Sequence, residues 1–251
     1  MNFAFNYHKS RNFDQILTAG NRLNNASQNK LTAIKYPYLT DYKLNAVDAC
    51  YSAILNPIKD ASGKQTGLDY LNGTEFLYGQ YQKGYIGSYD FNISGNINDR
   101  VFLGLTFGIH DVHYQSNSLY SENLEKETSA DAYESLKITG TGYDLKAGVI
   151  FRPIEQSPFR IGLYVNTPVW YDLHEAAATD VSMFNSSNNK LDKGHAVDYD
   201  YKVYTPWKFG VSLGHTIDKM VAIGATYEYA DYSRIDNRIN DGGGYDDWGY
   251  Y

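Results

Sequence analysis

Residues 101–109 read VFLGLTFGI, and this stretch decides the fold class. Its even-numbered positions after Phe102 are small or polar, whereas its odd-numbered positions are all apolar: Val101, Leu103, Leu105, Phe107 and Ile109. A period of two places apolar side chains on one face of a β-strand and polar side chains on the other. The stretch therefore predicts a strand with one apolar and one polar face.

The same alternation recurs along most of the chain. Apolar residues occupy every second position, with polar or glycine residues between them, in the segments Phe3–Tyr7, Tyr85–Ile93, Tyr143–Phe151, Phe159–Val165, Tyr199–Leu213 and Val221–Tyr229. About seven segments of this kind predict an all-β, antiparallel protein.

The connections between these segments alternate in length. Short turns rich in Asn, Asp and Pro are predicted at 96–100, 152–158 and 216–219, and long polar loops at 10–83, 115–134, 173–196 and after Tyr232. Short turns at one end and long loops at the other are typical of an up-and-down transmembrane β-barrel of the outer-membrane type, with long extracellular loops.

We therefore expect 1–251 to form a single partial barrel domain. It would consist of a strand at 1–9, a long loop at 10–83, about six strands within 84–232, and the start of a further loop at 233–251. Helical spacing within the first loop predicts short helices at Asp14–Leu17 and Asn45–Tyr51.

Composition narrows the functional classes. The net charge of −7 and the pI near 5.3 argue against nucleic acid as a partner, because such proteins need a basic surface. The mean hydropathy of −0.49 argues against an apolar helix long enough to span a membrane. Cys50 is the only cysteine, so the chain can form neither an internal disulfide nor a thiolate metal site.

Two interpretations of the alternation remain. In a soluble barrel or sandwich, the polar face would meet bulk water and carry Lys, Glu and Thr. Here that face is rich in glycine and carries a thin mixture of both charges, as a crowded barrel lumen would. Aromatic residues lie near the ends of the apolar stripes, where membrane-interface girdles occur: Tyr85, Tyr143, Tyr199, Trp207, Tyr227 and Tyr229. The pattern favours the membrane barrel.

Within residues 80–235 the chain resembles a known family. The segments that carry the resemblance are KGYIGSYDFNISGNINDRVFLGLTFGI (83–109), ITGTGYDLKAGVIFRPI (138–154), FRIGLYVNTPVWYDL (159–173) and YKVYTPWKFGVSLGHTIDKMVAIGATYEYADYS (201–233). They are similar to the outer-membrane long-chain fatty-acid transporters (FadL/TodX-like), in the branch often labelled putative hemin receptor. The most specific elements are Gly140–Gly142 with Arg152-Pro153, Arg160–Pro168, Thr205–Trp207 and Tyr227–Tyr232.

This resemblance implies a roughly fourteen-stranded barrel, plugged by an N-terminal hatch, that passes hydrophobic molecules by diffusion. The chain departs from the family in showing no signal peptide, no hatch with an Asn-Pro-Ala element and about half the strands. Because about seven strands cannot close a bacterial barrel, we expect the chain to be an interior part of a longer protein.

Lumen-facing cations are the candidate ligand-binding residues. On the strand pattern they share even, polar positions: Lys146, Arg152, Arg160, Lys202 and Lys208. Such cations beside apolar walls would bind the carboxylate of a fatty acid. The alternative is that they neutralise acids on the same face, namely Asp90, Asp144, Asp200 and Glu228.

The sequence gives no support for catalysis, a metal or a cofactor. His110 and His113 differ by three and so face opposite sides of a strand. Polar tracts at 185–200 and 241–247 lack EF-hand spacing, and no Ser/His/Asp, H-E-x-x-H or G-x-S-x-G motif is present.

The expected function is passive transport of hydrophobic solutes, such as long-chain fatty acids, through the bacterial outer membrane by a monomeric barrel. Its partners would be the solute and the surrounding lipid and lipopolysaccharide, without a cofactor. Two alternatives remain: a non-transporting barrel with adhesive or structural loops, and a soluble β protein that binds carbohydrate through Tyr and Trp.

Overall fold

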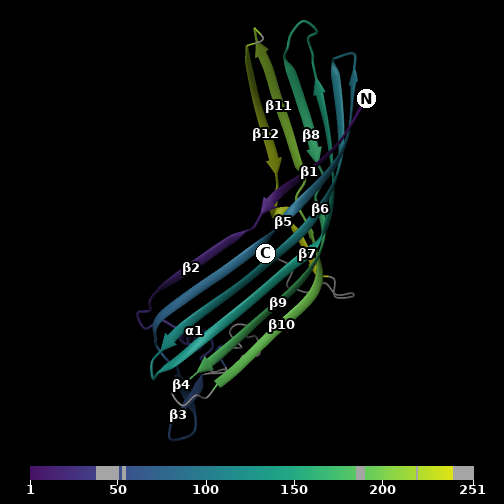
Figure 1. The fold of residues 1–251 in the computed structure, drawn as a ribbon. Coiled ribbons are helices and arrows are strands. Elements are labelled where there is room, and N and C mark those ends of the chain that lie inside the picture. The colour runs from purple at the N-terminus through teal and green to yellow at the C-terminus, as the bar shows by residue number, and fades with distance from the viewer. Residues whose placement is uncertain (38–50, 53–54, 185–189, 219, 240–251) are drawn as a thin grey trace.

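The computed structural model describes residues 1–37, 51–52, 55–184, 190–218 and 220–239. The chain is mostly antiparallel β structure, and its main sheet curls into a half-barrel (Figure 1). The expected all-β, antiparallel fold is confirmed at this level. No helix among the described residues is long and apolar enough to cross a membrane.

Three long strands form the centre of the sheet: β5 (Gly73–Ile97), β6 (Val101–Leu124) and β7 (Thr128–Phe151). They pair antiparallel along almost their whole length, from Ile97↔Val101 and Val101↔Phe151 at one end to Leu124↔Thr128 at the other. The first turn holds Asn98 and Asp99 at φ 52° and 53°, the left-handed values that tight hairpins need and that Asn and Asp adopt most readily.

The flanking strands come in collinear pairs, each of which we call a stave. On one side of β5 the stave is β1 (Asn2–Asn12) with β2 (Gln15–Arg22). Beyond β7 the staves are β8 (Arg160–Asn166) with β9 (Trp170–Phe184), β10 (Lys190–Tyr204) with β11 (Lys208–Ile217), and β12 (Val221–Ala230) with β13 (Asp236–Ile239).

The three staves beyond β7 are interrupted at the same level of the sheet, between the rows of Lys146 and Tyr143, whereas the break between β1 and β2 lies further from the short turns, opposite Lys83 and Gly84 of β5. Thr-Pro pairs mark two of the breaks, at Thr167 and Thr205, where proline cannot donate to the ladder. The threonine hydroxyls accept hydrogen bonds instead: Thr167 Oγ1 from the Leu145 amide at 3.0 Å, and Thr205 Oγ1 from the Val169 amide at 2.8 Å. The breaks divide the sheet into a short-turn half, with β8, β11 and β12, and a distal half, with β2, β9, β10 and β13 (Figure 1).

A small helical element closes the distal end. Helix α1 (Gln28–Lys35) begins at the N-cap Ser27, whose side chain accepts a hydrogen bond from the Lys30 amide. Beside it lies the separate hairpin of β3 (Asn56–Lys59) and β4 (Gln65–Asp69), and a short 3₁₀ helix, η1 (Tyr232–Arg234), precedes β13. Ala33, Leu55 and Leu68 form a small buried cluster between these elements.

Three predicted loops contain strands in the structure, so their boundaries were wrong. Strand β2 and the start of β5 lie within 10–83, β6 and β7 continue through 115–134, and β9 and β10 occupy most of 173–196. Neither face of these segments carries an unbroken apolar stripe, so they lack the alternation that marks a strand with one buried or lipid-facing side. The ladder hydrogen bonds of the longer neighbours extend them nevertheless.

The structure differs from two further sequence predictions. The predicted helix at Asp14–Leu17 is wrong, because Gln15–Arg22 is strand β2, whereas 45–50 lies outside the described residues. The stripe at Tyr199–Leu213 is two strands rather than one, since Thr205–Trp207 interrupts it.

Candidate functional site: the two faces of the half-barrel

The inner face of the sheet is the one against which α1 and Tyr51 pack. Tyr51 contacts Ala132 and Val181, and the α1 amide of Gln28 reaches Glu122. Glu122 and Ala132 are even-numbered residues of β6 and β7. Residues that pair directly across strands share a face, so even positions of β5, β6 and β7 face inward and odd positions outward.

The outer face of the short-turn half is apolar across every stave. One complete cross-strand row consists of apolar residues from seven strands: Phe3, Ile93, Leu105, Ala147, Val165, Phe209 and Tyr229. Most of these side chains are exposed, Phe209 by 50% and Phe3 by 71%, although they are large hydrocarbons. An exposed apolar face this wide is typical of a surface that contacts a membrane or another protein.

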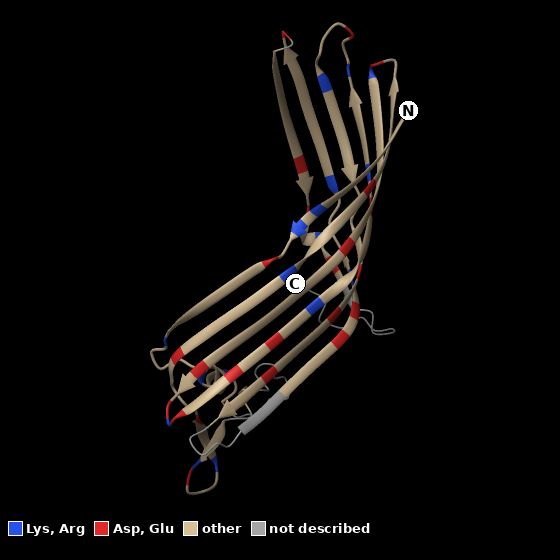
Figure 2. Cartoon of the chain, viewed as in Figure 1, with Lys and Arg blue, Asp and Glu red and all other residues tan. Residues whose placement is uncertain are grey.

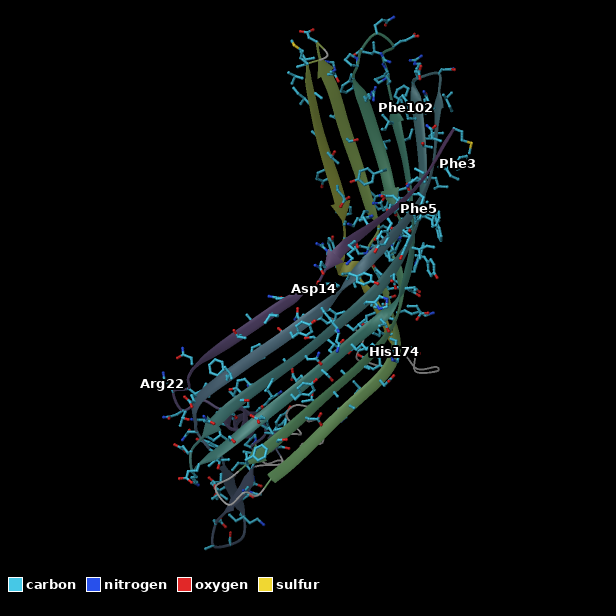
Figure 3. The ribbon with its side chains drawn as sticks, in the orientation of Figure 1. Phe3, Phe5, Asp14, Arg22, Phe102 and His174 are labelled. Carbon is cyan, nitrogen blue, oxygen red and sulfur yellow. The ribbon has the colours of Figure 1, made fainter. Side chains whose placement is uncertain are left out.

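No lysine, arginine or carboxylate interrupts the outer face between the short turns and one aromatic row. On β5, β6 and β7 the outward residues of this band are Tyr89, Phe91, Ile93, Gly95, Ile97, Val101, Leu103, Leu105, Phe107, Ile109, Tyr143, Leu145, Ala147, Val149 and Phe151. The row that bounds the band carries aromatic side chains from five strands, at Tyr7, Tyr89, Tyr143, Trp170 and Tyr204. Figure 3 shows Phe3 and Phe5 within the band on β1, and Asp14 at the junction with β2.

Charge begins in the next row outward. There the outer face carries four charged residues in register with one another: Lys9, Asp111, Asp172 and Lys202. One row further, His174 lies between two carboxylates, with Nδ1 2.8 Å from Asp200 and Nε2 3.3 Å from Asp198. Figure 2, which colours the charged residues of both faces, shows that they are frequent on the strands of the distal half and sparser on the strands of the short-turn half.

The inner face of the short-turn half holds a charged cluster, which we call the lumen cluster: His8, Ser88, Asp90, His110, Asp144 and Lys146. The Lys146 Nζ lies 3.1 Å from Asp90 Oδ1 and 3.5 Å from Asp144 Oδ2, so one cation serves two acids. Both acids are buried, Asp144 with only 5% of its side chain exposed. Buried carboxylates of this kind depend on the shared cation.

Serine, histidine and aspartate are in contact within this cluster. Ser88 Oγ is 3.0 Å from His110 Nδ1, and His110 Nε2 is 3.5 Å from Asp144 Oδ1. The order resembles that of a nucleophile, a base and an orienting acid. However, Ser88 is 1% exposed, so its oxygen is closed to a substrate in this arrangement. Ser88 and His110 therefore share a buried hydrogen bond, whereas His110 Nε2 and Asp144 Oδ1 are in contact without forming one.

Glycine provides the space for these polar side chains. A Cβ on Gly108 would collide with the Asp144 carboxylate, and one on Gly210 would collide with the Tyr164 ring. Each glycine therefore faces a larger polar side chain on the neighbouring strand. This packing explains Gly108 and Gly210, whereas a Cβ on Gly104 or Gly214 of the same face would meet open space.

Three of the five predicted cations lie on the inner face. Besides Lys146, Lys208 lies 3.7 Å from Glu228, whose carboxylate also accepts the Tyr164 hydroxyl at 2.7 Å. Arg160 stacks over the Phe102 ring at 5.6 Å, near the short turns. The two lysines thus neutralise acids of the same face, as the alternative interpretation expects.

The other two predicted lumen cations lie elsewhere. Arg152 follows the end of β7, and its guanidinium donates to the carbonyls of Ser157 and Glu155 within the turn. Lys202 lies on the outer face. The segment 205–207 contains one residue more than the stretch of β7 alongside it, so odd and even residues exchange faces between β11 and β10. Asp200 moves to the outer face for the same reason.

Outside the apolar band, one buried acid anchors α1 to the sheet. Glu122 Oε2 accepts hydrogen bonds from the Gln28 amide at 3.2 Å and from the Tyr120 hydroxyl at 3.2 Å. Burial raises the pKa of the Glu122 carboxyl, and the two hydrogen bonds offset this only in part. Burial also raises the pKa of the Tyr120 hydroxyl, with Glu122 as the second cause.

The lumen cluster was only partly predictable. Asp90, Asp144 and Lys146 were expected on the polar face, and His110 and His113 do face opposite sides, His113 contacting Asp111 at 3.1 Å. Ser88 and His8 were missed, because their contact with the cluster depends on cross-strand register. Within the described residues no group of three or more His, Cys, Asp or Glu side chains is placed to hold a metal ion.

Comparison with known proteins adds nothing to this geometry: no family model, curated protein or solved structure matches the chain.

Proposed function

We propose that the chain forms part of the wall of an outer-membrane barrel that passes hydrophobic solutes passively, long-chain fatty acids being the type. The uncharged band on the outer face carries this proposal. Tyr89 and Ile97 bound the band on β5, and the eight residue-to-residue steps between them, at about 3.3 Å each and tilted by about 40°, span roughly 20 Å along the membrane normal. Outer-membrane barrels have an apolar band about 25 Å tall with aromatic girdles.

The inner face suits a polar, water-filled lumen. It carries the lumen cluster and the Lys208–Glu228 pair, whose charges would be costly against lipid, together with many glycines. A soluble barrel would need the opposite arrangement, with the apolar face turned into a core. The resemblance to the long-chain fatty-acid transporters supports a hydrophobic solute as the cargo.

The two edges of the sheet have a consequence for assembly. Among the described residues, β1 with β2 and β12 with β13 have a paired neighbour on one side only. Unpaired backbone groups in lipid cost several kcal/mol each. In the membrane both edges therefore pair with further strands, from a longer chain or from a second copy, and we call this assembly the closed barrel.

A non-transporting barrel with surface-exposed strands is the second candidate. Its supporting observation is that β5, β6 and β7 continue about 15 residues beyond the aromatic row and carry α1 at their ends. Such a projection would suit adhesion as well as solute capture.

Uptake separates the two candidates. The closed barrel is produced in bacteria that lack their own fatty-acid transporter, and entry of a labelled fatty acid is compared with that of its methyl ester. A transport channel accelerates both, and Lys208→Ala slows the acid more than the ester, because only the carboxylate gains the charge-assisted contact. Entry no faster than in cells without the protein would refute transport and favour the second candidate.

A further inference from the structure

A hollow on the outer face lies directly beyond the aromatic row. Its volume is about 340 Å³, and it opens between β1, β5, β6 and β7. Three lysines and one histidine from these four strands line it: Lys9, Lys83, His113 and Lys137. Lys83 and Lys137 lie in one cross-strand row on either side of Gln115, about 10 Å apart at two strand spacings.

Few of the cations that line this hollow are held in direct ion pairs. Lys83 and Lys137 make no ion pair with any described residue, and the Lys9 Nζ lies 5.0 Å over the Tyr85 ring. The one carboxylate in the lining is Asp14, whose Oδ1 accepts the Gly84 amide at 3.2 Å. The nearby Asp111 is held by His113 and by the Tyr85 hydroxyl.

The near part of the hollow lies at the depth of lipid headgroups. Lys9 is two residues past Tyr7, and Lys83 is six residues past Tyr89. With the strand rise and tilt used above, the lining extends about 5–15 Å beyond the apolar band. Because phospholipid headgroups occupy only about 5–8 Å on each side, a ligand that contacts the whole lining would need a larger headgroup.

The rest of the lining fits sugar chemistry. Asn12, Gln115 and Thr139 provide amide and hydroxyl groups that bond to sugar hydroxyls, and Tyr85 provides aromatic surface. We propose that this hollow binds the phosphorylated sugar headgroup of a membrane glycolipid, with the three lysines on its phosphate. The proposal rests on the membrane position of the apolar band proposed above.

Binding to the purified closed barrel in detergent tests the site. The probes are monophosphoryl lipid A and the same lipid without phosphate, with native mass spectrometry as the readout. Wild type should bind the phosphorylated form at least tenfold more tightly, and the double variant Lys83→Gln/Lys137→Gln should lose this preference. The matched control is Lys59→Gln/Lys64→Gln, two exposed lysines on the separate β3–β4 hairpin, which should bind as wild type does.

Three results would overturn the proposal. They are equal binding of the two lipid forms by wild type, an unchanged preference in the double variant, and an equal loss in the control variant, which would mean unspecific charge attraction. Release of the lipid by millimolar inorganic phosphate would show a free-anion site and would overturn the lipid assignment. The test involves no transport, so failed solute uptake leaves it intact, and its own failure leaves the channel proposal intact.

Discussion

Lys146 and Lys208 should contribute very differently to stability, although both are lysines on the inner face. Lys146 forms ion pairs with Asp90 and Asp144, which are both buried, and 33% of its own side chain is exposed. Removing one partner of a buried ion pair costs about 3–5 kcal/mol. Because Lys146 is partly hydrated, we expect Lys146→Met to cost about 2–4 kcal/mol.

Lys208 and Glu228 are 37% and 42% exposed and 3.7 Å apart. Exposed pairs contribute about 0–1 kcal/mol, so Lys208→Met should cost less than about 1 kcal/mol. The assay is urea unfolding of the closed barrel in lipid vesicles, followed by tryptophan fluorescence. In a double-mutant cycle, Asp144→Asn should recover part of the loss in the Lys146→Met background, since it removes one of the two unpaired charges.

Two outcomes would refute this reasoning. Equal costs for the two lysine variants would mean that burial of the acids does not decide the energetics. A cost below about 1 kcal/mol for Lys146→Met would mean that the cluster is hydrated in the closed barrel, as exposed pairs are.

Three further perturbations test other parts of the structure. Val211→Lys places a charge in the apolar band and should cost about 2–4 kcal/mol of folding free energy in vesicles; equal or larger cost for Ser212→Lys would contradict the facing. Gly108→Ala should disrupt the lumen cluster and lower the unfolding midpoint, whereas Gly104→Ala, with open space around its Cβ, should not. Because the pKa of Glu122 is raised, the folded state holds the carboxyl proton more tightly than the unfolded state, and hydrogen-exchange protection of α1 should fall as the pH rises above 4.5, the ordinary pKa of a glutamate. Glu122→Gln should remove this pH dependence. A variant with the same pH profile as wild type would contradict the role of Glu122.

The strands of the apolar band were predicted well, because a strand with one apolar and one polar face shows apolar residues at every second position. The alternation at Leu103, Leu105 and Phe107 predicts both the strand and its apolar face. The distal half was predicted as loops, because a strand with two polar faces has no such period, as in Ser116–Glu122. Only the pairing of β6 with both neighbours shows that this segment is extended.

The candidate site was harder to predict because facing depends on every residue between two points. One extra residue at Thr205–Trp207 reverses the facing in β10 and carries Lys202 to the outer face, while Lys208 stays inside. The contact of Ser88 with His110 requires the register of β5 on β6, which no single strand contains. Sequence alone thus predicts which residue types share the inner face but not which of them meet.

Alternating contact with lipid and water along β6 tests the membrane interpretation most directly. With Cys50 replaced by Ser, single cysteines at Leu103, Gly104, Leu105 and Thr106 would carry spin labels in the closed barrel in vesicles. Labels at 103 and 105 should be relaxed mainly by oxygen, which partitions into lipid, and labels at 104 and 106 mainly by a water-soluble nickel chelate. The absence of alternation, or its reverse, would contradict the assignment of the outer face to lipid.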